Sequence, residues 1–173
     1  MTADFTLAAT WRDTGVPDPA AHPELFEGVL WRRAAAYVID AFCIAAIWVA
    51  AWLLFALLTV LSLGLLAPGL WFLFGLIPLA YHTLLVGGPH AATLGMRAFD
   101  LQLRSSNGER PVLLQALAHA ALFYLTVAAT GSLILLFALF NRRKRTVHDV
   151  LTGMLMVRGP ARLLPPVADP RLR

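Results

Sequence analysis

The chain has 173 residues, of which 59% are hydrophobic and 14% are charged, and its formal net charge is +4. Soluble domains carry charge on about a quarter of their residues. The apolar residues here fall into two long blocks, 34–86 and 112–140, which excludes an ordinary soluble domain and predicts an all-α membrane protein. A soluble protein with a buried helical core is the alternative, but the uncharged block 112–140 leaves no face for water to solvate.

The two ends of the chain differ from these blocks in composition. Residues 1–28 hold five of the ten acidic residues against the single base Arg12. A secretory signal has a basic start followed by an apolar core, so this segment is predicted to be a disordered acidic tail. Residues 159–173, rich in proline and arginine, are predicted to be a second disordered tail. The basic excess then belongs to the membrane domain 29–158, where it fits a membrane flank and does not require nucleic acid.

The first apolar block predicts two membrane spans. After Asp40 it contains no Lys, Arg, Asp or Glu, and Pro68 with Gly69 marks a tight turn inside it. We place the spans at about 31–64 and 69–86, because roughly 20 residues cross a bilayer. The triplet Gly-Gly-Pro at 87–89 ends the second span, since it cannot continue a helix.

A short pair of strands is predicted on the cytoplasmic side. The segment FDLQLR at 99–104, within the loop 87–111, alternates apolar and polar residues, which is typical of a strand. The segment GMLMVR at 153–158 is predicted to pair with it. Such pairing requires both segments to lie on one side of the membrane.

The basic residues conflict with a single crossing by residues 112–140. Arg32 and Arg33 place the N-terminus in the cytoplasm, and the bases of the loop 87–111 return there after two spans. The basic cluster 142–145 also belongs inside, which a third complete span would prevent. Residues 112–140 therefore either cross once or re-enter as a shallow hairpin that bends near 130–132. We favour the hairpin, with both termini on the cytoplasmic side of the membrane.

Asp40 is the most costly residue of the apolar blocks. A carboxylate at mid-helix costs about 2.5 to 3.5 kcal/mol on insertion, so it should face the bundle interior and have a partner. Arg33 lies on the same helical face, but about 10 Å away along the axis, which is too far for a direct bond. Arg33 and Asp40 are therefore each predicted to find a partner outside this helix. The available groups are Arg97, His82, His119, His148 and Asp149.

Several roles stay open for these residues. Asp40 either closes a structural ion pair or binds an ion or proton, and Arg33 either snorkels to set the orientation or joins the ion pair. His148 and Asp149 either form a solvated pair near a helix start, or Asp149 caps the last segment or anchors it on the loop that contains Arg97. His82 and His119 are either hydrogen-bonded core residues or proton relays or ligands.

Motifs of enzymes and metal centres are missing from the sequence. There is no phosphate loop, HExxH, GxSxG or dinucleotide fingerprint. Cys43 is the only cysteine, which excludes an internal disulfide and a thiolate cluster. The histidines and aspartates show no metal-ligand spacing. We therefore predict no metal site, no cofactor and no enzymatic activity.

Three motifs in order resemble the RDD family of bacterial membrane proteins, named for one arginine and two aspartates. Arg33 and Asp40 match the first two of these residues, within WRRAAAYVID, and Asp149 matches the third, within RTVHDVLTGMLMV. The segment AATLGMRAFDLQLRSSNGERP is similar to the family's Gly-Ala-Thr-x-Gly-Lys-Arg stretch and the strand that follows it. The resemblance covers about residues 29–158.

The chain also departs from this family pattern. Ala91 stands where the family often has glycine, Met96 where lysine is common, and Met154 where threonine is usual. An arginine early in the third apolar block is missing, with His119 nearby. A ligand role that depends on the lysine does not carry over. The resemblance implies a mostly uncharacterised membrane protein for which transport of an unknown ligand is the usual suggestion.

Two functions are compatible with these residues. In the first, the protein transports a small solute or exchanges a cation for protons, as a homo-oligomer, and Asp40 binds the ion or proton. In the second, it is a non-transporting scaffold or accessory subunit, in which Arg33, Asp40 and Asp149 form a structural clasp. In both, the surrounding partner is the lipid bilayer.

Overall fold

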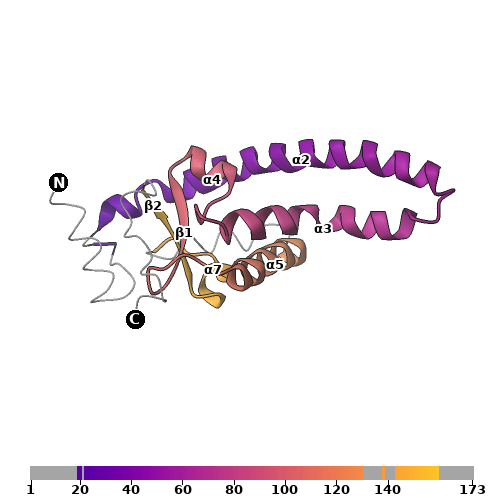
Figure 1. Ribbon diagram of the computed structural model, residues 1–173. Coiled ribbons are helices and arrows are strands. Elements are labelled where there is room, and N and C mark those ends of the chain that lie inside the picture. The colour runs from indigo at the N-terminus through magenta and orange to yellow at the C-terminus, as the bar shows by residue number, and fades with distance from the viewer. Residues whose placement is uncertain (1–18, 21, 131–137, 139–142, 160–173) are drawn as a thin grey trace.

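The computed structural model describes residues 19–20, 22–130, 138 and 143–159 (Figure 1). Most of the two predicted tails lies outside these residues. The fold is helical with one two-stranded sheet, as predicted. In chain order its elements are η1 (Pro23–Leu25), α2 (Val29–Leu61), α3 (Ala67–Val86), α4 (Leu94–Ala98), β1 (Leu101–Ser105), α5 (Leu113–Thr130), α7 (Val147–Leu151) and β2 (Met154–Arg158).

Helices α2 and α3 form a long antiparallel hairpin that extends well beyond the other elements (Figure 1). Together with α5, they are the helices of the described chain that are long and apolar enough to cross a membrane. The buried residues of α2 all lie in its N-terminal half: Val29, Ala36, Asp40 and Ile44. Their spacing places them on one helical face. The rest of α2 has its apolar side chains exposed or half-buried, as expected of a helix surrounded by lipid.

A proline inside α3 contributes to the contact between the two helices. Pro78 has no N–H, so the carbonyl of Phe74 loses its helical donor. Trp48 of α2 donates its indole N–H to that carbonyl at 3.1 Å. The rings of Trp48 and Phe74 also stack, with centroids 5.7 Å apart. The proline therefore frees an acceptor that ties α3 to α2.

The strands β1 and β2 pair antiparallel, with Leu103 opposite Met156, which confirms the predicted pairing. One face of the sheet packs against Val29 and Ala36 of α2. On β2, Leu155 packs in a second cluster with residues that precede α2: Leu25 and Phe26. The predicted boundary of the disordered tail at residue 28 is therefore a few residues too late, because these two apolar side chains are buried under the sheet.

The short helix α4 packs closely on α2. The Thr93 hydroxyl caps its start and accepts a hydrogen bond from the Met96 N–H at 3.2 Å. At Gly95 a Cβ atom would overlap the carbonyl oxygen of Ala36 in α2, so only glycine permits this approach. The contact brings the Gly95 N–H next to Asp40.

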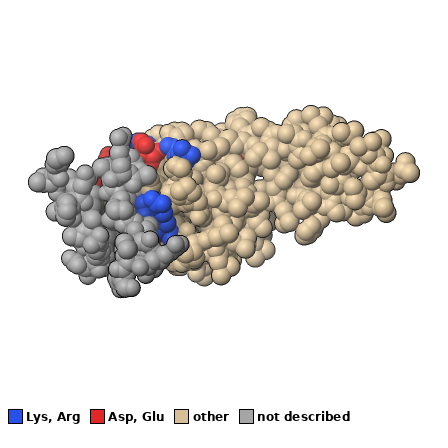
Figure 2. All heavy atoms as spheres, viewed as in Figure 1, with Lys and Arg blue, Asp and Glu red and all other residues tan. Residues whose placement is uncertain are grey.

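The segment between the strands leaves the sheet and returns to it. It leaves through α5, which packs on α3, and returns through α7, which contacts both α5 and β2. The pairing of β1 with β2 therefore places both ends of this segment at one end of the molecule. The predicted bend at 130–132 lies almost entirely outside the described residues. The charged residues visible in Figure 2 gather at the sheet end, whereas the far half of the hairpin is uncharged.

Candidate functional site

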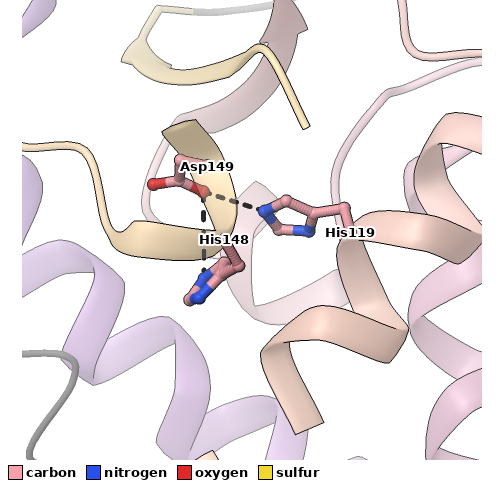
Figure 3. A group of neighbouring side chains, drawn as sticks. All are labelled: His119, His148 and Asp149. Atoms are coloured by element: carbon pink, nitrogen blue, oxygen red, sulfur yellow. Dashed lines mark hydrogen bonds and ion pairs between the residues drawn. The ribbon is translucent and has the colours of Figure 1, made fainter. Parts of the chain in front are cut away.

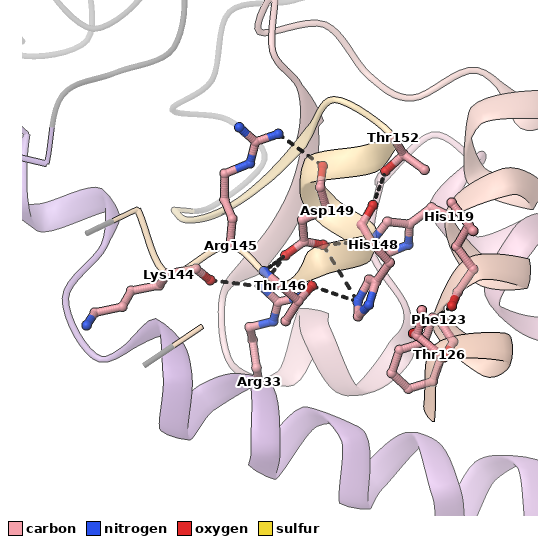
Figure 4. Close-up of polar contacts among 11 residues, drawn as sticks. Arg33, His119, Phe123, Thr126, Lys144, Arg145, Thr146, His148, Asp149 and Thr152 are labelled. Atoms are coloured by element: carbon pink, nitrogen blue, oxygen red, sulfur yellow. Dashed lines mark hydrogen bonds and ion pairs between the residues drawn. The ribbon is translucent and has the colours of Figure 1, made fainter. Parts of the chain in front are cut away.

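Arg33 of α2 and Asp149 of α7 form a buried ion pair (Figure 4). The Arg33 Nη1 atom lies 2.6 Å from Asp149 Oδ2, and Asp149 is completely buried. Thr146 donates its backbone N–H to the same oxygen at 2.9 Å, as in one half of a capping box. Arg33 Nη1 also donates to the Lys144 carbonyl at 3.2 Å. The pair thus joins the first membrane helix to the C-terminal part of the domain.

The other carboxylate oxygen of Asp149 faces two histidines (Figure 3). His119 of α5 places its Nε2 atom 2.8 Å from Asp149 Oδ1, and the Nε2 atom of His148 lies 3.8 Å from that oxygen. His148 Nε2 is also 2.8 Å from the Thr146 hydroxyl. The Nδ1 atom of His148 is buried and has no hydrogen-bond partner in the part of the chain that the structure describes. Side chains from α2, α5 and α7 therefore converge on one aspartate.

Burial and charge act in opposite directions on the Asp149 carboxyl. Burial by itself raises its pKa, but the Arg33 charge and the His119 hydrogen bond outweigh burial and hold the pKa well below its usual range. At His148, burial dominates over the attraction of Asp149 and lowers the pKa to about 3. At neutral pH Asp149 is therefore an anion and His148 is neutral.

Asp40 is also buried, but its partners are not the predicted ones. Its Oδ1 atom accepts hydrogen bonds from the Tyr81 hydroxyl at 2.7 Å and the Gly95 N–H at 2.8 Å. Its Oδ2 atom accepts one from the Thr93 hydroxyl at 2.6 Å. Among the described residues, no Lys, Arg or His lies within ion-pair distance of it. The partners of Arg33 and Asp40 come from outside α2, as predicted, and Arg33 pairs with one of the named groups, Asp149. For Asp40 the named groups were wrong, because three neutral donors satisfy the carboxylate.

The remaining predicted partners have other positions. His82 of α3 places its Nδ1 atom 2.9 Å from the Tyr124 hydroxyl and 3.1 Å from the Pro78 carbonyl. Arg97 is exposed on α4. His119 and His148 gather around Asp149 rather than Asp40. The interpretation of His148 and Asp149 as a solvated pair is wrong, since both side chains are buried.

A cavity of about 490 Å³ connects the two aspartate sites. Asp40 and His82 contribute to its lining, and so do Arg33, His119 and His148 from the Asp149 site. The rest of the lining is mostly apolar, and the volume is typical of small-ligand cavities. Of the two charged-type side chains in this lining, Arg33 pairs with Asp149, which lies behind the lining, and Asp40 has no basic partner among the described residues.

Sequence reasoning missed the three donors that surround Asp40. Tyr81 lies near the C-terminal end of an apolar helix, where an aromatic residue has a simple packing explanation. Thr93 and Gly95 belong to the family-like segment AATLGMR, but that segment does not say which carboxylate they contact. The signal was an N-cap threonine followed by a glycine, a pattern typical of a tightly docked helix start.

Comparison of the chain with curated proteins finds no match, and comparison with solved structures finds none either. A comparison with protein-family models finds one, and it matches residues 28–153, well over half of the chain. This match includes Arg33, Asp40 and Asp149, the three residues on which the resemblance rests. The protein is a member of the RDD family of integral membrane proteins.

Proposed function

We propose that this protein exchanges a small cation for protons and that Asp40 is the carboxylate that binds them. The supporting observation is that Asp40, 2% exposed, lines the 490 Å³ cavity without a basic partner among the described residues. An ionisable residue inside a membrane helix is costly and typically marks an ion or proton site. A carboxyl group without a basic partner favours a cationic ligand over an anionic one.

The hydrogen bonds of Asp40 suit competition between a cation and a proton. Three donors stabilise the ionised carboxylate. A carboxylate offers about two acceptor positions on each oxygen, so Oδ1 is filled and Oδ2 has one position left after Thr93. A proton and a metal cation would compete for that position, and such competition is the simplest basis for exchange.

We further propose the bacterial inner membrane as the location, with both termini in the cytoplasm. Two features support this topology: the basic residues lie near the sheet, and the segment between β1 and β2 begins and ends there. Such a segment would re-enter the membrane rather than cross it completely. A homo-oligomer is part of the proposal, because the three apolar helices of the described residues are too few to line an ion pathway across the membrane.

Flux measurements in proteoliposomes test the role of Asp40. We expect Asp40→Asn to abolish cation-dependent proton movement, because the amide has the same shape but cannot bind a proton or balance a cation. Asp100→Asn is the matched control, because Asp100 is an exposed carboxylate outside the cavity. Equal flux from the wild type and Asp40→Asn would show that Asp40 does not bind the exchanged cation or proton.

The second candidate function is a non-transporting scaffold, and the buried Arg33–Asp149 pair favours it. The pair joins residues 116 positions apart at 2.6 Å, which is the geometry of a structural clasp. This function predicts that the wild-type protein moves no cation or proton in proteoliposomes. The scaffold interpretation would be rejected if the wild type shows flux and Asp40→Asn, present in the membrane in the same amount, does not.

A further inference from the structure

The two oxygens of Asp149 have separate surroundings. Oδ2 accepts from Arg33 at 2.6 Å and from the Thr146 N–H at 2.9 Å, so the clasp occupies it. Oδ1 faces the imidazoles of His119 and His148 at 2.8 and 3.8 Å. One oxygen of the carboxylate is therefore structural, and the other forms a cluster with two histidines (Figure 3).

The dimensions of this cluster suit a transition-metal ion. One ligand atom from each of His119, His148 and Asp149 can be chosen so that all three lie within 4.8 Å of one another. Ligands about 2.0 to 2.2 Å from a tetrahedral zinc ion lie about 3.3 Å apart. The separations of 2.8 and 3.8 Å from Asp149 Oδ1 lie on either side of that value, and all three ligand atoms lie within 4.8 Å of one another, so modest side-chain shifts would bring them to the spacing of three metal ligands.

Two further observations point to a ligand here. His148 is 1% exposed, yet its Nδ1 atom has no hydrogen-bond partner among the described residues, although buried polar atoms are normally satisfied. The other ring nitrogen, Nε2, is the one near Asp149, and an ion bound to it would replace its contact with the Thr146 hydroxyl at 2.8 Å. His119 and His148 also line the 490 Å³ cavity, so a bound ion would have a vacant coordination position on that side. Three protein ligands with one open position is the arrangement of exchangeable rather than closed structural sites.

We propose that His119, His148 and Asp149 bind a divalent transition-metal ion such as Zn²⁺ or Co²⁺. Two imidazoles and a carboxylate suit ions of intermediate hardness and not Na⁺ or Mg²⁺. Arg33 keeps its hydrogen bond to Asp149 Oδ2 and so fixes the orientation of the carboxylate. Its positive charge lowers the affinity of the site for the metal ion. This site departs from the prediction of no metal site, which rested on spacing along the sequence. It does not depend on the proposed transport through Asp40.

Metal titration of the purified full-length protein tests this site. The protein carries an affinity tag without histidines, is stripped with a chelator in detergent, and is titrated with Co²⁺. We expect one Co²⁺ per chain, with the intense visible absorption of four- or five-coordinate cobalt, and displacement by Zn²⁺. His119→Gln and His148→Gln should each weaken binding at least about tenfold, because each removes one of three ligands.

His82→Gln is the matched control, because His82 lines the same cavity but lies outside the cluster. It should bind Co²⁺ like the wild type. No saturable binding by the wild type, or unchanged affinity in both His119→Gln and His148→Gln, would overturn the proposal. X-ray absorption of the zinc-loaded wild type gives a readout that does not depend on variant folding. Two imidazole ligands and one carboxylate are expected, and a shell of water oxygens alone contradicts the site.

Discussion

Asp40 and Asp149 are both buried carboxylates, but their neighbours give them different properties. Three neutral donors hold Asp40, whereas Asp149 has a guanidinium and a histidine. Removing a charge should therefore affect stability mainly at Asp149, because only there is a buried counter-charge left behind. At Asp40 the larger effect is expected on ion binding.

Asp149→Asn is expected to destabilise the folded protein by about 3 to 5 kcal/mol, the usual cost of removing one partner of a buried pair. The substitution leaves Arg33 half-enclosed without its counter-ion and weakens the start of α7. Thermal unfolding in detergent, with the chelator present, measures the effect. Asp100→Asn should stay within about 0.5 kcal/mol of the wild type, as exposed substitutions usually do. Equal loss in both variants contradicts a clasp at Asp149.

His148 makes the stability of the metal-free protein depend on pH. Burial lowers its pKa to about 3 in the folded protein, against about 6.5 in the unfolded chain. The folded state therefore favours neutral histidine, and the resulting stability is fully present above pH 6.5. It is lost as pH falls from 6.5 towards 3, because the unfolded state takes up the proton first.

His148→Gln should flatten this part of the pH profile, because glutamine does not titrate. Unfolding midpoints at a series of pH values, recorded with the chelator present, would test it. His22→Gln, a change near the start of the described chain and away from the cluster, should keep the wild-type slope. A wild-type slope in His148→Gln would assign the dependence to another group.

At the scale of elements, the contact between α4 and α2 depends on a single missing side chain. Gly95→Ala places a Cβ against the Ala36 carbonyl, so α4 must move away and take the Gly95 N–H from Asp40. We expect a loss of about 1 to 3 kcal/mol, as for other overpacked sites, together with weaker cation binding at Asp40.

Gly75→Ala is the control for Gly95→Ala. Gly75 is inside α3, and a Cβ there would meet no atom within 4 Å, so alanine should be neutral or stabilise the helix by about 0.5 to 1 kcal/mol. Unfolding midpoints of both variants decide the matter. Similar unfolding midpoints for Gly95→Ala and Gly75→Ala would show that α4 can move away from α2 without loss of stability, which contradicts the close contact at Gly95.

The elements themselves were largely predictable from the sequence, and their partners were not. Blocks without charge predict α2 and α3, and period-two alternation predicts β1. The predicted turn at Pro68 and Gly69 was placed too late, because these residues form the first turn of α3 and the connection lies at 62–66. The bonds from Tyr81 and Gly95 to Asp40 span 41 and 55 residues. They depend on how α3 and α4 dock against α2, and no local pattern records that docking. The cluster of His119 with Asp149 was missed for the same reason.

At the scale of the whole molecule, the proposed topology can be tested by labelling. In a Cys43→Ala background, Asn107→Cys lies in the exposed turn after β1 and Leu65→Cys at the exposed tip of the hairpin. We expect a membrane-impermeant maleimide to label the tip in intact spheroplasts and the turn only after lysis. Labelling of both positions from outside contradicts a cytoplasmic sheet.

The length of α2 has a consequence for the depth of Asp40. Its 33 residues rise about 50 Å, whereas the hydrocarbon layer is about 30 Å thick. Twenty residues counted back from Leu61 reach only to Phe42, and Tyr81, which bonds Asp40, lies five residues from the last residue of α3. With Leu61 at the far edge of the hydrocarbon layer, Asp40 would lie close to the opposite headgroup layer. In the proposed exchange, an ion bound there would still have most of the acyl region to cross, so the proposed second copy would have to line that distance along the exposed end of the α2–α3 hairpin.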